Sequence, residues 1–146
     1  MKISKNKFLG MLVFLLVSSI SISGQYKDQL VSLMSDFRNK VYENVDEGHD
    51  VQQKDALRAM QEEWDKELNI VYQKIMKIAN TKTKNNLRNA QRAWLKSRDK
   101  KVHDSYYFEN PEGGSMGVLF SLNTNVKLLE QRTLELAEMY DRLTGK

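Results

Sequence analysis

Residues 90–99 read AQRAWLKSRD, and this stretch decides the architecture of the chain. Helical steps of three and four place five side chains on one stripe: Leu87, Gln91, Trp94, Arg98 and Val102. A buried guanidinium without a partner costs several kcal/mol, so the polar members of this stripe need partners. We interpret them as residues that fix how the helix packs. A binding site that opens between helices is the alternative.

The partner of Arg98 is expected on another helix, because Asp99 follows it directly and neighbouring residues do not share a helix face. Backbone carbonyls, or water reached past a buried stem, would also satisfy the guanidinium. Three carboxylates elsewhere in the sequence are candidates: Glu67, Glu130 and Glu135.

Apolar spacing by threes and fours continues along most of the chain, and no segment alternates as a strand would. It predicts four helices, over residues 26–45, 51–79, 84–107 and 118–143, the last with an alternative start at Asn123 or Thr124. Asp50 and Thr83 are the predicted N-caps of the second and third helices. The fold class is therefore all-α, a small helical bundle.

The turn at 80–84 is short, which predicts that the second and third helices form a long antiparallel hairpin. In such a hairpin Trp64 and Trp94 lie at different layers of one interface between these two helices. The bundle is then completed by one helix before the hairpin and one after it.

The first 24 residues have the pattern of a secretory signal. Three lysines precede the apolar run at 8–17, and small residues follow it at 18–24. We expect cleavage near 23–25, export to the periplasm or beyond the cell, and a single helical domain over 25–146. An uncleaved anchor is the alternative, although the run is short for a membrane span.

Composition restricts the function classes. The chain has 23 Lys and Arg against 19 Asp and Glu. Three of these bases and none of the acids lie in 1–24, so the exported part is close to neutral. Together with export, this argues against a nucleic-acid partner. The chain has no cysteine, so the domain depends on packing alone.

No catalytic or cofactor motif occurs in the sequence. His49 and His103 are the only histidines, and the acidic run 46–50 lacks the ligand order of a calcium loop. We expect no metal, no cofactor and no enzyme activity.

Four basic residues stand four apart on the other face of the third predicted helix: Arg88, Arg92, Lys96 and Lys100. A solvated face accounts for them, and contact with an anionic surface or an acidic protein is the alternative.

Three blocks in order resemble one known family. They are DKELNIVY at 65–72, LRNAQRAWLKSRD at 87–99, and GGS at 113–115 followed by LLEQRTLEL at 128–136. Over about 55–140 the chain resembles the LprI-type lysozyme inhibitors, which are small exported helical domains. The matching motif positions, which we interpret as structural, are Leu68, Asn69, Tyr72, Gln91, Trp94, Arg98, Asp99 and Arg132, together with the glycine-serine block. Family members usually carry cysteines, so this chain resembles a cysteine-free variant.

The resemblance implies a binding protein whose partner is lysozyme or another secreted or envelope protein. The alternative is a structural module of the cell envelope that uses the basic helix face. The residues themselves offer an aromatic loop for contact, because aromatic side chains commonly dominate binding energy. The predicted contact residues are Tyr107, Glu109, Glu112, Gly113, Gly114 and Ser115.

Overall fold

The computed structural model describes residues 24–46, 48–108 and 111–145. It contains four helices, α1 (Gln25–Tyr42), α2 (Asp50–Ile78), α3 (Thr81–Tyr106) and α4 (Ser115–Thr144), and no strand within these ranges. The prediction of an all-α bundle is confirmed. The predicted signal peptide lies outside the described residues except for Gly24.

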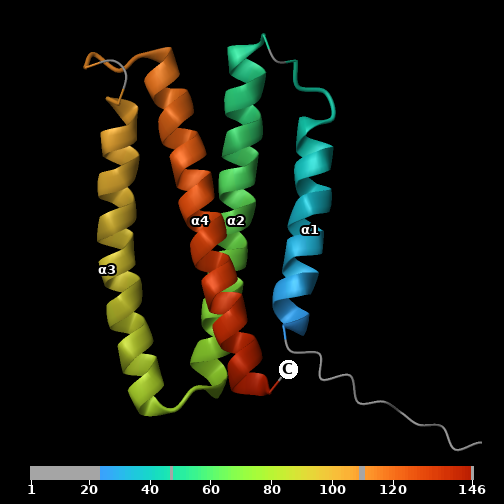
Figure 1. The fold of residues 1–146 in the computed structure, drawn as a ribbon, viewed down its shortest axis with the longest axis vertical. Helices are drawn as coiled ribbons and strands as arrows, with labels where there is room; N and C mark the ends of the chain where they lie inside the picture. The colour runs from blue at the N-terminus through green and yellow to red at the C-terminus, as the bar shows by residue number, and fades with distance from the viewer. Residues whose placement is uncertain (1–23, 47, 109–110, 146) are drawn as a thin grey trace, which may run out of the picture.

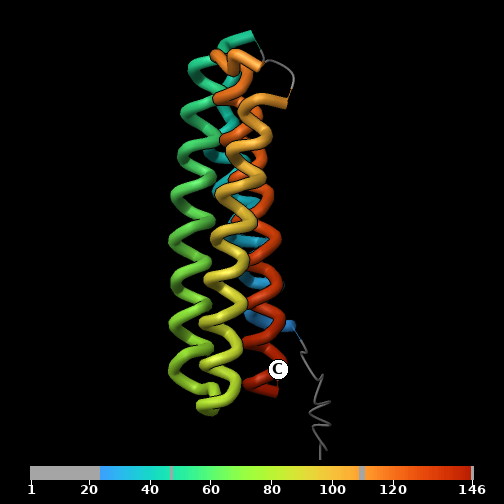
Figure 2. The backbone as a smooth tube through the Cα atoms, turned by 90° about the vertical axis from the view of Figure 1, so that its left-hand side faces the viewer, coloured from blue at the N-terminus to red at the C-terminus, as the bar shows by residue number. Residues whose placement is uncertain are grey.

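Successive helices run in opposite directions, so α1 and α3 point one way and α2 and α4 the other (Figure 1). The parallel pair α2 and α4 makes the most extensive contact in the bundle. α3 packs on α4, and α1 packs on both members of the pair. The view in Figure 2 shows α2 and α3 as separate rods with α4 beside α3. α2 and α3 therefore run antiparallel, as predicted, but they make few contacts with each other.

The expected interface between two tryptophans is wrong. Trp64 is 1% exposed, and its surroundings belong to α1 and α4. Its carbonyl accepts a hydrogen bond from Thr133 Oγ1 of α4 at 3.4 Å, and it lines a hollow with Val31 and Met34 of α1. Trp94 of α3 is only half-buried. The physical reason is that α4 presents more apolar surface to α2 than α3 does.

The distribution of buried side chains follows this arrangement. From α2 they are Ala56, Leu57, Met60, Trp64, Glu67, Leu68, Val71 and Ile75. From α4 they are Gly117, Val126, Leu129, Thr133, Leu136, Ala137 and Asp141. α1 adds Leu30 and Met34, whereas α3 contributes Leu87 alone. The core therefore lies between α1, α2 and α4, and α3 is an outer helix.

Helix ends differ from the sequence prediction by a few residues. The N-cap of α3 is Asn80, not Thr83, because Asn80 Oδ1 accepts a hydrogen bond from the Thr83 backbone N–H at 2.8 Å. The N-cap of α2 is His49, not Asp50, and its side chain makes no capping hydrogen bond; Asp50 is the first residue of the helix. α4 begins at Ser115, before the predicted start and well before the alternative at Asn123 or Thr124.

A carboxylate from α4 caps the first turn of α1. Asp141 is 2% exposed, and its two oxygens accept the backbone N–H groups of Tyr26 and Lys27, each at 3.0 Å. The rings of Tyr26 and Tyr140 meet edge to face, with centroids 5.2 Å apart, and Lys74 lies over both. A helix N-terminus favours negative charge, so this contact joins the start of the domain to its last turn.

Candidate functional site

The loop between α3 and α4 is built around the ring of Tyr106. A Cβ added to Gly113 would lie 2.1 Å from this ring, and one added to Gly117 would lie 2.4 Å from the Tyr106 carbonyl oxygen. Gly113 also has a φ of 72°, which a side chain would strain. The Gly114 N–H donates to Tyr106 Oη at 3.2 Å. Two glycines thus admit the ring, and a backbone hydrogen bond fixes it.

Ser115 ties this loop to the start of α2. Its hydroxyl donates to Asp50 and accepts from the Lys54 ammonium, which also pairs with Asp50 at 2.9 Å. The hydrogen bonds from Ser115 and then from Lys54 hold the pKa of Asp50 below its ordinary value. The connection between α3 and α4 is therefore held at both of its ends.

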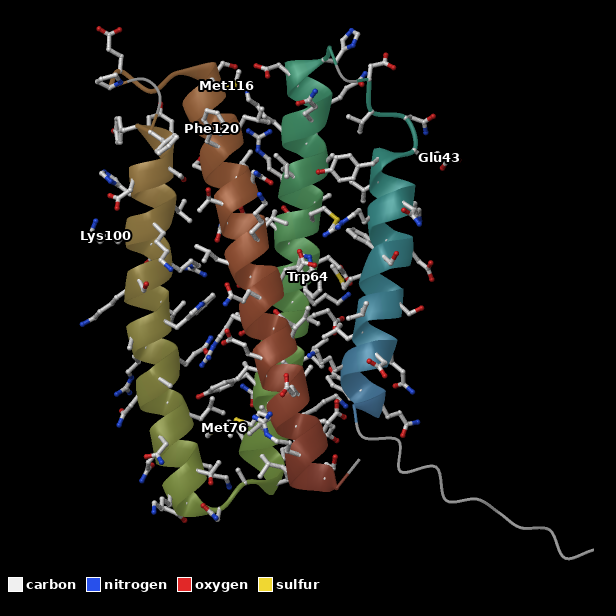
Figure 3. The ribbon with its side chains drawn as sticks, in the orientation of Figure 1. Glu43, Trp64, Met76, Lys100, Met116 and Phe120 are labelled. Atoms are coloured by element: carbon white, nitrogen blue, oxygen red, sulfur yellow. The ribbon has the colours of Figure 1, made fainter. Side chains whose placement is uncertain are left out.

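Two aromatic side chains project beside this fixed turn. Phe108 is 80% exposed and Tyr107 is 44% exposed. Tyr107 contacts the ring of Tyr106, with centroids 4.8 Å apart, and the ring of His103 at 5.1 Å. Figure 3 places Met116, which is 52% exposed, at the same end of the bundle. We call this end, with Tyr107, Phe108, Glu112 and Met116, the loop end.

A hollow of about 440 Å³ opens near the loop end, between α1, α2 and α4. Its lining residues are Tyr42, Val45, Gln53, Leu57, Leu119, Phe120 and Asn123. The loop end therefore combines projecting aromatic groups with a concave, mainly apolar surface.

The predicted contact residues divide into two groups. Gly113 is buried, and Gly114 and Ser115 are engaged with Tyr106 and α2, so these three support the loop. Tyr107 and Glu112 are exposed. Glu109 lies outside the described residues.

The polar residues of the opening stripe find their partners on α4 and within α3. Gln91 Oε1 accepts a hydrogen bond from Arg132 Nε at 3.0 Å, and Arg132 also pairs with Glu135 at 3.0 Å. The stripe therefore faces α4. Gln91 therefore takes part in the contact between α3 and α4.

Arg98 pairs with the residue that helical geometry disfavoured. Its Nε and Nη2 lie 3.0 and 2.8 Å from Asp99 Oδ1, and its guanidinium lies 5.3 Å from the centroid of the Trp94 ring. The predicted partners are wrong: Glu130 pairs with Arg38, Glu135 with Arg132, and Glu67 is buried elsewhere. A long side chain that folds over Trp94 can reach its neighbour, so no carboxylate from another helix is needed.

The remaining motif residues, Leu68, Asn69 and Tyr72, belong to α2. Leu68 is buried, Tyr72 is half-buried, and Asn69 Nδ2 donates to the Asp65 carbonyl at 2.8 Å and to Asp65 Oδ2 at 3.3 Å. Because α2 and α3 barely touch, a groove of about 420 Å³ remains between them. It is lined by Asp65, Leu68, Asn69, Tyr72, Arg88, Gln91, Arg92 and Leu95. We call it the α2–α3 groove.

Sequence reasoning missed this groove and the role of Tyr106 and Gly117. A signal for the groove was present, since both helices repeat the spacing i, i+3, i+4, i+7 with polar and apolar members mixed. Nothing in the sequence indicated that α4 would separate α3 from α2.

The predicted basic stripe lies on the exposed surface of α3. Figure 3 shows Lys100 projecting from the outer side of the bundle, where it pairs with Asp104 at 2.6 Å. Arg88 donates to Asn85 at 3.0 Å. Arg92 and Lys96 have no ion-pair partner in the described part of the chain. The stripe is therefore only partly neutralised.

A metal-binding cluster and a membrane-spanning helix are both absent from the described ranges. No group of three His, Cys, Asp or Glu residues there could hold a metal ion. None of the four helices has an apolar stretch long enough for a membrane crossing.

Comparison with curated proteins gave no match, and neither did comparison with solved structures. The family model described as Lysozyme inhibitor LprI matches residues 39–136. The resemblance found from the sequence blocks is thus confirmed. Because the matched segment covers more than half of the sequence, the chain belongs to the LprI lysozyme inhibitor family.

Proposed function

We propose that this protein is exported, binds lysozyme and inhibits it with the loop end of the bundle. Membership of the LprI lysozyme inhibitor family supports the target. The observation that carries the choice of surface is the exposure of Phe108, which is 80%. A large aromatic side chain held in water gains free energy when a partner covers it, and such residues are frequent binding hot spots.

The loop end is also rigid at its base. Tyr106 is packed on Gly113 and Gly117, and Ser115 is bonded to Asp50 and Lys54 of α2. A loop whose two ends are held in place before binding loses less conformational entropy when it binds. Inhibition by such a loop needs no catalytic group, which agrees with the expectation that the protein is not an enzyme.

Negative charge at the loop end also favours binding to lysozyme. Glu112 is exposed beside the aromatic pair, and the sequence places Glu109 in the same connection. Carboxylates at the rim of an interface accelerate association with a basic partner and add modest affinity. Basic residues are common on lysozymes, so these two carboxylates are expected to steer the encounter.

The test follows lysis of cell-wall material by several lysozyme types in the presence of micromolar purified protein. We expect inhibition, and we expect Tyr107→Ala with Phe108→Ala to weaken it by about tenfold or more. The matched control is Ile78→Ala, which removes a 49% exposed apolar side chain from the opposite end of α2. This control should inhibit like the parent protein.

Glu109→Ala with Glu112→Ala should weaken inhibition less, and mainly at low salt. Absence of inhibition with every lysozyme type would remove the proposed target. Equal losses of inhibition in the aromatic variant and in Ile78→Ala would show that the loop end is not the contact surface.

A second candidate function is an envelope module that uses the basic face of α3. The observation that favours it is the charge of this helix, which has eight Lys and Arg against two Asp. Co-sedimentation with envelope fractions that disappears in moderate salt would support it. Binding that persists in salt, or that is unchanged in Lys96→Gln with Lys100→Gln, would exclude it.

A further inference from the structure

Four of the family-motif residues meet on the α2–α3 groove: Leu68, Asn69, Tyr72 and Gln91. Its volume of about 420 Å³ lies in the range of small-molecule pockets. It is separate from the loop end, because its residues come from the middle of α2 and the first half of α3.

Two amide side chains in the groove are held in fixed orientations. Asn69 uses its Nδ2 on the Asp65 carbonyl and carboxylate, which leaves Oδ1 as an acceptor. Gln91 uses its Oε1 on Arg132, which leaves Nε2 as a donor. The groove therefore offers one acceptor and one donor from two oriented amides, the complement of an acetamido group.

The apolar part of the groove comes from Leu68, Tyr72 and Leu95. Leu68 is 3% exposed, Leu95 is 37% exposed, and Tyr72 packs partly against the core. A tyrosine ring with aliphatic neighbours can cover the apolar face of a sugar ring while the hydroxyl remains available for a hydrogen bond. Tyr72 Oη has no hydrogen-bond partner among the described residues.

The charge of the groove favours an anion. Arg88 and Arg92 lie one helical turn apart against the single carboxylate of Asp65, which is engaged with Asn69. Arg88 is bonded only to the neutral Asn85, and Arg92 has no partner within the described ranges. Guanidinium groups bind carboxylates with paired, charge-assisted hydrogen bonds.

From these three features together we propose that the α2–α3 groove binds a small amino sugar that carries both an acetamido group and a carboxylate. The guanidinium of Arg92, with Arg88 beside it, takes the carboxylate. Asn69 and Gln91 take the acetamido group, and Tyr72 with its aliphatic neighbours covers the ring. This site is independent of the contact with lysozyme proposed above.

The probe is N-acetylmuramic acid, and the matched comparison is N-acetylglucosamine, which has the same acetamido sugar without the carboxylate. Binding to the purified protein is followed by NMR titration at millimolar ligand. We expect N-acetylmuramic acid to bind about tenfold more tightly, the difference that one charged hydrogen-bonded contact supplies. Shifts should be confined to the residues of the groove.

Variants separate the groove from the basic surface. Arg92→Gln and Asn69→Ala should each weaken binding by about fivefold or more. Lys96→Gln removes the next charge on the same face of α3 but does not line the groove, so it should bind like the parent. Thermal unfolding of each variant checks that the fold is intact.

Three results would overturn the proposal: equal binding of the two sugars, equal loss in Lys96→Gln and Arg92→Gln, or equal affinity for inorganic phosphate. The last would identify a general anion site without sugar recognition. None of these measurements involves lysozyme, so loss of inhibition and loss of sugar binding remain distinguishable.

Discussion

Helices α2 and α3 are consecutive and similar in length, yet they are held in the molecule in different ways. α2 has 29 residues and buries eight side chains, among them Trp64 at 1% exposure. α3 has 26 residues and buries only Leu87. α2 is therefore a core element stabilised by apolar burial. α3 is an outer helix that packs on α4 with Leu87 buried and Trp94 half-buried, and that adds a polar contact between Gln91 and Arg132.

This difference explains where one of the concave surfaces lies. A helix that buries little apolar area leaves space along its flanks, and the α2–α3 groove occupies that space. The end of α3 instead carries Tyr106, which packs on Gly113 and Gly117, and the exposed Phe108. The helix that contributes least to the core thus positions both candidate binding surfaces.

The largest expected effect contrasts the two tryptophans. Trp64→Ala removes a fully buried indole and should lower the free energy of unfolding by about 3–5 kcal/mol. Trp94→Ala removes a half-buried indole covered by Arg98 and should cost about 1–2 kcal/mol. Urea unfolding followed by circular dichroism measures both. Similar losses would mean that α3 is as much a part of the core as α2.

The next effect concerns the connection that holds the end of α3. A Cβ at Gly117 would lie 2.4 Å from the backbone oxygen of Tyr106, which cannot move without shifting the helix end. Gly117→Ala should therefore cost about 2 kcal/mol and accelerate amide exchange in the last turns of α3. Gly48→Ala is the control, because nothing lies within 4 Å of its added Cβ. Unchanged exchange in α3 would show that the turn does not anchor it.

The sequence was sufficient to predict the helices and the antiparallel course of α2 and α3, because apolar spacing and a short connection are local properties. It was insufficient to predict which helices pack together. The stripe of Gln91 and Trp94 is compatible with either α2 or α4 as its partner, and the choice depends on which helix supplies the larger apolar face to α2. The outcome depends on the apolar areas of α2, α3 and α4 together, and the sequence of one segment does not determine it.

The candidate sites divide in the same way. The aromatic loop was recognisable because Gly113, Gly114 and the tyrosines are adjacent in sequence. The α2–α3 groove was not predicted, although both of its helices carry the repeated spacing, because its formation depends on how α3 and α4 pack. The pairing of Arg98 with Asp99 was missed for a different reason. Helical periodicity gives the direction of each Cα–Cβ bond. The long side chain of Arg98 bends over Trp94 and so reaches Asp99.

A smaller effect tests the polar attachment of α3 to α4. Gln91→Ala should lower stability by about 1 kcal/mol, the usual net value of one hydrogen bond, because Arg132 keeps its pairing with Glu135. Asn89→Ala changes an exposed neighbour on the same helix and should be close to neutral. A double-mutant cycle with Arg132→Ala isolates the pair. Zero coupling would show that this hydrogen bond does not help to hold α3 on α4.

The smallest effect concerns the carboxyl group of Glu67, which α2 buries in the core. Burial raises the pKa of Glu67, an effect that Lys66 opposes, Glu63 reinforces and Lys74 opposes. A carboxyl whose pKa is raised by folding binds its proton more tightly in the folded state. Its contribution to stability is therefore fully present below the ordinary value of 4.5 and is lost as pH rises through the raised pKa.

Glu67→Gln removes this titration while keeping the shape of the side chain. The variant should gain stability relative to the parent as pH rises from 4 to 7, by no more than about 1 kcal/mol, and the two should converge in acid. The matched control is Glu62→Gln on the exposed face of α2, for which the difference should stay flat. A flat difference for Glu67→Gln as well would mean that water reaches this carboxylate, and that the core of α2 is more open than its burial of Trp64 implies.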